Sequence, residues 1–78
     1  MADTIDIVKQ SIAELCKCNA KELMPETKLA QELKMRSVIR IELAAVLEER
    51  CGVKITTFDI LKPKTVQDIV TMIEKKKD

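Results

Sequence analysis

Ser37 is the residue of this sequence with the clearest chemical use, because its hydroxyl lies at the start of a strongly helical segment. The stretch before it is longer than a small helical domain needs to join two helices. This placement is typical of a residue that carries or presents an attached group. The simpler interpretation is a helix N-cap, in which the serine oxygen accepts a hydrogen bond from a free backbone N–H group. Local sequence alone favours the cap.

Three cysteines and the absence of histidine limit the remaining chemistry. Composition permits a metal site of three thiolates, but Cys16 and Cys18 are too close for the usual two-residue ligand spacing. We therefore expect Cys16, Cys18 and Cys51 to be reduced, mostly buried thiols, with no metal site. Without histidine there is no Ser–His or Cys–His pair, and no other residue offers an evident base. The sequence predicts a protein without enzymatic activity of its own.

Length and composition favour a single small helical domain over residues 1–78. The chain has one glycine and two prolines and is rich in Ala, Leu, Ile, Glu and Lys, which suit helix interiors. A core this small depends on well-formed helices. No apolar run has the length of a membrane span, and the N-terminus lacks the pattern of a signal peptide. We expect a soluble, cytoplasmic monomer with no membrane partner.

The net charge and the aromatic content indicate which kinds of macromolecule the chain can bind. A formal net charge of +1 argues against a general nucleic-acid binder, and a single aromatic residue leaves no stacking platform for single strands. The positive charge is nevertheless uneven, since Lys34, Arg36 and Arg40 cluster around one predicted helix start. Cations are disfavoured at a helix N-terminus, so we expect this cluster to have a compensating use. Lys75–Lys77 are most simply a solvated C-terminus.

Hydrophobic spacing predicts an all-α fold of three main helices and one short helix. The first helix is predicted from the apolar stripe between Ile5 and Leu15, with Asp3 or Thr4 as its cap. From about residue 16 to residue 35 the periodicity lapses, which indicates a long loop tethered to the core. The residues expected to anchor this loop are Leu23, Leu29 and Leu33.

The second helix is predicted from about Ser37 to Cys51, where Gly52 supplies a left-handed stop. A single helical turn is expected around residues 58–61, and the last helix opens with a Thr65-x-x-Asp68 cap. The residues expected to be buried at the centre of the bundle are Leu43, Leu47, Ile69 and Ile73.

The second helix has two apolar faces when its residues are placed about 100° apart. One face is the expected core stripe of Ile39, Leu43, Val46 and Leu47. The opposite face mixes acids with small apolar residues: Glu42, Glu48 and Glu49 with Val38, Ile41 and Ala45. Such a mixture is typical of a docking surface, where apolar contact supplies affinity and charge aligns the partner. The alternative is that Val38 and Ile41 lie under the long loop and belong to the core.

At this point the chain resembles the acyl carrier proteins and the related polyketide, peptidyl and aminoacyl carrier domains. The resemblance is carried by L-x-x-x-S-V-x-x-I-E-L from Leu33 to Leu43, by residues 47–55 and by the T-V-Q-D opening of residues 65–68. It covers most of the chain and implies a small four-helix bundle of acyl-carrier type, with a long loop between helices 1 and 2.

The resemblance also implies a function. In such proteins the serine carries a 4′-phosphopantetheine arm, derived from coenzyme A, whose thiol holds an acyl or aminoacyl group as a thioester; here that serine is Ser37. The implied partners are a phosphopantetheinyl transferase and the acyl-loading and acyl-transferring enzymes of fatty acid, polyketide or related lipid pathways. The predicted partner surface comprises Lys34, Arg36, Val38, Arg40, Ile41, Glu42, Ala45, Glu48 and Glu49.

Arg36 departs from the family pattern, which usually has Asp immediately before the serine. We therefore expect a specialised carrier with its own partners. In the competing interpretation, the chain is an unmodified carrier-like interaction module in which Ser37 is only an N-cap. A more distant alternative is an anion-binding helical module that uses Lys34, Arg36 and Arg40 for phosphate or nucleic acid, which predicts strong salt dependence.

Overall fold

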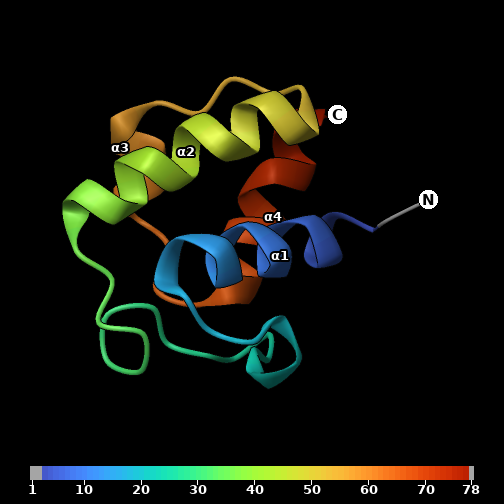
Figure 1. Cartoon of the computed structure of the whole chain (residues 1–78). Coiled ribbons are helices and arrows are strands. Elements are labelled where there is room, and N and C mark those ends of the chain that lie inside the picture. The colour runs from blue at the N-terminus through green and yellow to red at the C-terminus, as the bar shows by residue number, and fades with distance from the viewer. Residues whose placement is uncertain (1–2, 78) are drawn as a thin grey trace.

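The computed structural model describes residues 3–77, and within them the chain forms four α-helices and no strand. The helices are α1 (Thr4–Cys16), α2 (Ser37–Cys51), α3 (Thr57–Leu61) and α4 (Val66–Lys77), and a short 3₁₀ turn at Ala20–Glu22 interrupts the long loop. Helix α1 packs against both α2 and α4, while α3 packs against α2. Figure 1 shows the long loop passing from the end of α1 around one side of the bundle to the start of α2. The predicted all-α fold is confirmed.

Local sequence signals end and begin the helices as expected. Gly52 adopts φ = 69° and its N–H bonds to the Glu48 carbonyl at 2.9 Å, which closes α2 with a left-handed residue. At the start of α4, the Asp68 N–H donates to Thr65 Oγ1 and the Thr65 N–H donates to Asp68 Oδ2, both at 3.2 Å. This is the predicted capping box, and it satisfies two N–H groups that a helix start leaves free.

The core is formed by apolar residues from all four helices and the loop. The residues with no exposed surface include all four that were expected at the centre: Leu43, Leu47, Ile69 and Ile73. The predicted stripe of α2 is partly wrong, because Ile39 and Val46 are only half-buried. Their places are taken by Ala44 and Arg40, so the buried line runs from Arg40 to Leu47 at helical spacing.

The long loop is tied to the start of α4 by backbone hydrogen bonds. The N–H groups of Leu29, Val66 and Gln67 donate to the carbonyls of Lys64 (2.9 Å), Thr27 (3.1 Å) and Pro25 (2.8 Å), respectively. Of the predicted anchors, Leu23 and Leu29 are buried and Leu33 is half-buried against the core. The expected tethered loop is therefore confirmed.

The three thiols are free but only half-buried, so the expectation that they are mostly buried is wrong. Cys16 and Cys51 each lie at the last position of a helix. Burial, and to a lesser extent the neighbouring Cys18, raises the pKa of the Cys16 thiol. None of the helices in residues 3–77 combines the length and apolar character needed to span a bilayer.

Candidate functional site

Ser37 is the first residue of α2 rather than its cap. The N-cap is Arg36, whose backbone is extended (φ = −84°, ψ = 165°) and whose side chain makes no capping hydrogen bond. The N-cap interpretation of Ser37 is therefore wrong. Its side chain is exposed, and among the described residues no hydrogen-bond partner lies beside the hydroxyl. The structure leaves this oxygen free for chemistry.

The backbone around Ser37 is fixed on both sides. Two residues before it, Met35 is buried and its N–H donates to the Leu29 carbonyl at 3.0 Å. Lys34 reaches this anchor through a left-handed conformation with φ = 50°. Beyond Ser37, the first helical hydrogen bond of α2 runs from the Arg40 N–H to the Arg36 carbonyl at 3.0 Å. A rigid element therefore presents the exposed serine.

The first turn of α2 favours a negatively charged group. The N–H groups of Ser37, Val38 and Ile39 precede the first intrahelical hydrogen bond, so the helix itself supplies them with no acceptor. These N–H groups and the helix dipole attract an anion. Lys34 and Arg36, both exposed, add positive charge at the same end of the helix. The start of α2 is thus suited to a phosphate ester on the serine.

Arg40 does not lie on the exposed basic cluster, which corrects the expectation from sequence. Its side chain is buried, and Nη1 donates to the carbonyls of Ile60 at 3.4 Å, Leu61 at 3.1 Å and Pro63 at 2.7 Å. These carbonyls lie at and just beyond the end of α3, where a helix leaves acceptors without partners. Arg40 therefore fixes α3 against α2, and the exposed basic residues before and at the helix start are Lys34 and Arg36.

The outward face of α2 is exposed, as the docking interpretation predicted. The side chains of Val38 and Ile41 are 63% and 46% exposed, so they do not lie under the long loop. Ala45, Glu42 and Glu49 are exposed on the same helix. Glu48 differs, because it is half-buried and its Oε1 accepts the Ile55 N–H at 2.7 Å. This carboxylate holds the segment that follows α2.

Sequence analysis missed two exposed apolar residues on α3. Phe58 is 70% exposed and Leu61 is 43% exposed, whereas Ile60 between them is fully buried. Lys62 Nζ lies 4.5 Å from the centre of the Phe58 ring, a cation–π contact. A helix of five residues can bury only one narrow face, and this was the signal available in the sequence. Helices α2 and α3 thus both expose apolar side chains.

The comparisons with known proteins agree with this geometry. Residues 6–73 match the family model described as phosphopantetheine attachment site. The chain belongs to the phosphopantetheine-dependent acyl carrier protein family. It is 35% identical over 75 residues to the acyl carrier protein of Helicobacter hepaticus, covering 96% of this chain and 99% of that protein. It is 32% identical, also over 75 residues, to the acyl carrier protein of Thermosynechococcus vestitus, covering 96% and 93% of the two chains.

Membership of this acyl carrier family identifies the chain as a carrier and not a catalyst, with a covalently attached 4′-phosphopantetheine. Biosynthetic enzymes and a phosphopantetheinyl transferase are its general partners. The chain is also 32% identical over 68 residues to the meromycolate extension acyl carrier protein of Mycobacterium leprae. These 68 residues are 87% of this chain and 59% of that protein.

The other serine of the chain is not accessible to solvent. Ser11, the second of the two serines in the sequence, has no exposed surface. Its Oγ donates to the Ile7 carbonyl at 2.7 Å and accepts from Arg50 Nη1 at 3.1 Å. Ser37 is therefore the serine with an accessible hydroxyl.

Among the described residues, no cluster of three or more His, Cys, Asp or Glu side chains is arranged to hold a metal ion.

Proposed function

We propose that Ser37 carries the 4′-phosphopantetheine arm and that the chain acts as a single carrier domain for an acyl or aminoacyl intermediate of a fatty acid, polyketide or related lipid pathway. The observation that carries the proposal is the contrast between the two serines. Ser37 is exposed with a free hydroxyl, whereas Ser11 is buried and bonded on both sides. Attachment at Ser11 would require the α1–α2 contact to open.

The residues around Ser37 fit the attached group. Its phosphodiester would lie next to the free N–H groups of the first turn, with Lys34 and Arg36 adding positive charge. When bound, the arm supplies a thiol that holds the cargo as a thioester. The chain's own part is positional, because Met35 and the first turn of α2 fix where the arm begins.

The proposed docking surface comprises the exposed side chains of α2 and the residues just before it. Val38, Ile41 and Ala45 supply apolar contact, and Glu42 and Glu49 supply negative charge. Lys34 and Arg36 make the helix start positive, and Arg40 is excluded because it is buried. Glu48 has a structural role and at most a partial one in docking. A surface of mixed sign favours dedicated enzymes with complementary patches over partners of a single charge. We further propose that the carrier acts as a monomer.

Intact-protein mass spectrometry tests the attachment. The chain is incubated with coenzyme A, Mg²⁺ and a broad-specificity phosphopantetheinyl transferase. We expect a gain of one phosphopantetheine in the wild type and in Ser11→Ala, and none in Ser37→Ala. If several transferases give no gain, the unmodified interaction module replaces this proposal. If Ser37→Ala is still modified, the attachment residue is wrong.

Arg36→Asp tests partner choice. This substitution restores the acidic residue that the family usually has before the serine, and it reverses the charge at the start of α2. We expect faster modification by a general transferase and slower transfer by the carrier's own partner enzyme. The loss should shrink as salt rises, because exposed charges act mainly on association. Unchanged transfer at low salt would leave the basic residues without a role in recognition.

A further inference from the structure

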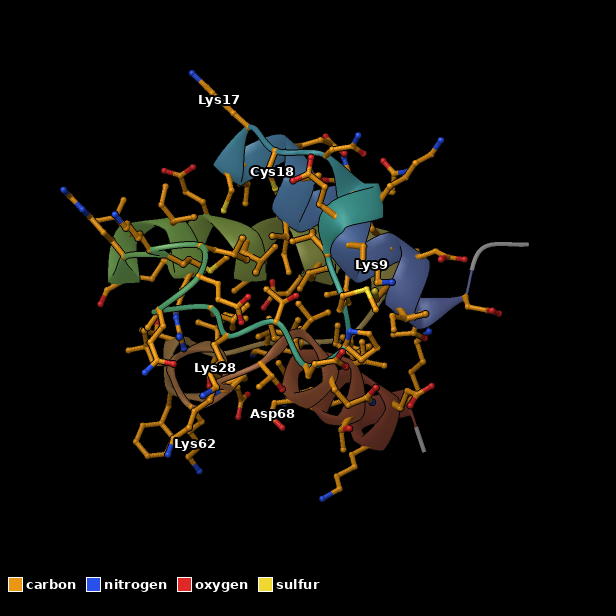
Figure 2. All side chains as sticks on the ribbon, turned by 90° about the horizontal axis from the view of Figure 1, so that it is seen from below. Lys9, Lys17, Cys18, Lys28, Lys62 and Asp68 are labelled. Carbon is orange, nitrogen blue, oxygen red and sulfur yellow. The ribbon has the colours of Figure 1, made fainter. Side chains whose placement is uncertain are left out.

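A cavity of about 570 Å³ lies between the long loop, the first turns of α2 and the start of α4. Its wall includes three cationic residues, Lys28, Arg40 and Lys64, and a single carboxylate, Asp68. Figure 2 shows Lys28 on the loop and Asp68 on α4 on the same side of the molecule. Arg40 follows Ser37 by three positions, so their Cβ atoms are about 5–6 Å apart on the helix surface. The cavity wall therefore begins within one turn of the proposed attachment residue.

Arg40 has a hydrogen-bonding edge that the α3 carbonyls do not use. Its guanidinium carries five N–H donors, and all three bonds to α3 and the residues after it come from Nη1. Within residues 3–77, no fully buried side-chain nitrogen or oxygen lacks a partner, so Nε and Nη2, which form no hydrogen bond, retain some exposed surface, and Arg40 lines the cavity. The N–H groups on this edge are parallel and match the two oxygens of a carboxylate or phosphate. Arg40, a residue of the cavity wall that is 9% exposed, thus carries a preformed fork of unbonded donors.

The two lysines are held close together and their charges are not neutralised. Lys28 and Thr65 form an isolated backbone bridge, and the Leu29 N–H donates to the Lys64 carbonyl at 2.9 Å. Neither lysine side chain forms an ion pair in the described part of the chain. Asp68 supplies one negative charge against the three positive charges, and its Oδ2 is held by the N–H groups of Lys64 at 3.1 Å and Thr65 at 3.2 Å. Cations gathered around one cavity repel each other unless an anion lies among them.

We propose that this cavity binds an oxyanion, a carboxylate or a phosphate group, delivered by the arm on Ser37. Arg40 then has two simultaneous contacts: Nη1 with the α3 carbonyls and the Nε–Nη2 edge with the oxyanion. Lys28 and Lys64 add charge from the loop and from the residue pair before α4. Two parts of the loaded arm bear such a group, namely its phosphodiester and the free carboxylate of a dicarboxylic acyl cargo. The delivery depends on the proposed attachment at Ser37, whereas the site itself does not.

Nuclear magnetic resonance of the full chain without the arm tests the site directly. Inorganic phosphate and acetate are titrated separately at constant ionic strength, with sodium chloride as the control, while the Arg40 Nε–H signal is followed. We expect a saturable shift with phosphate or acetate and none with chloride. The double variant Lys28→Gln/Lys64→Gln should weaken binding by about three- to tenfold, because exposed charges contribute modestly. Arg40 itself is left unchanged, since it also fixes α3.

A matched control separates the cavity from general charge. Lys21→Gln/Lys54→Gln removes the same number of exposed lysines away from this cavity and should leave the affinity unchanged. The absence of a saturable Arg40 shift with either anion, or equal weakening in the two double variants, would overturn the proposal.

The loaded forms then identify the source of the anion. The Arg40 signal is compared in the arm-free chain, in the chain with the arm alone, and after loading from butyryl- or succinyl-coenzyme A. A shift with the arm alone indicates the phosphodiester, and a shift with succinyl but not butyryl indicates a cargo carboxylate. If free anions bind but no loaded form shifts the signal, delivery by the arm is wrong. If the chain acquires no arm, the proposed function fails while the titration still decides the site.

Discussion

Helix α4 begins with a reciprocal cap between Thr65 and Asp68, whereas α2 begins at Ser37 after an N-cap residue, Arg36, whose side chain forms no capping bond. The start of α4 is also joined to the long loop through the backbone of Val66 and Gln67. At the start of α2, the serine hydroxyl and the first-turn N–H groups remain open. The start of α2 therefore lacks the stabilisation that a side-chain cap would add, at the point where the Ser37 hydroxyl is exposed. The start of α4 stabilises the fold, and the start of α2 leaves its hydroxyl and N–H groups available for an attached anion.

Removal of the Arg40 guanidinium, one turn into α2, should have the largest effect on the stability of the fold. Arg40→Met keeps much of the side-chain volume but leaves the carbonyls of Leu61 and Pro63 without this donor. We expect a loss of about 1–3 kcal/mol in the free energy of unfolding, measured by urea denaturation. Arg36→Met, at the exposed end of the same helix, should change it by less than about 0.5 kcal/mol. Equal effects of the two substitutions would show that Arg40 has no special role in holding α3.

The two helix starts should respond differently to loss of a hydroxyl. Thr65→Ala removes the acceptor for the Asp68 N–H and should cost about 1 kcal/mol, whereas Ser37→Ala should leave stability nearly unchanged. Thermal denaturation of both variants without the arm provides the comparison. A cost at Ser37 as large as that at Thr65 would mean that the Ser37 hydroxyl caps α2 in solution.

The free energy of unfolding, measured as a function of pH at acidic pH, should reveal the ion pair between α3 and α4. Lys76 Nζ lies 2.8 Å from Asp59 Oδ2, and this contact, together with hydrogen bonds from Thr56, lowers the pKa of Asp59 from 3.8 to about 2. Because the folded-state pKa is the lower one, this stabilisation is complete above pH 3.8 and is lost as the pH falls through about 2. Asp59→Asn should therefore flatten the wild-type loss of stability in this range. Parallel pH profiles for the wild type and Asp59→Asn would contradict this assignment.

Features with local signals were predictable from the sequence. Gly52 ended α2 and the Thr65-x-x-Asp68 motif opened α4, because each depends on residues that are close in the chain. The burial of Arg40 was not predictable in this way, because its acceptors are 20 to 23 residues further along. Glu48 similarly bonds to a backbone group seven residues away, across the helix end. The sequence could therefore place Ser37 at the start of α2 and predict the exposed face of that helix, but not which charged side chains would turn inward.

The exposure of Phe58 could not be deduced for a related reason. Apolar residues in a short helix are normally assigned to the core, and the choice between Ile60 and its neighbours depends on how α3 lies against α2. The contacts that hold that orientation are tertiary: the Arg40 hydrogen bonds to the end of α3, the burial of Ile60 and the Lys76–Asp59 ion pair. The inward-facing arginine thus changes the surface charge of α2 and contributes to the placement of α3.

Peptide-level mass spectrometry of the modified chain tests the central claim most directly. Trypsin cleaves after lysine and arginine, so the two serines fall in different peptides, residues 10–17 with Ser11 and residues 37–40 with Ser37. We predict that the phosphopantetheine mass is found on residues 37–40, while residues 10–17 are recovered unmodified. Phosphopantetheine on residues 10–17, or on neither peptide after modification of the intact chain, would contradict the proposal that the open start of α2 presents the arm.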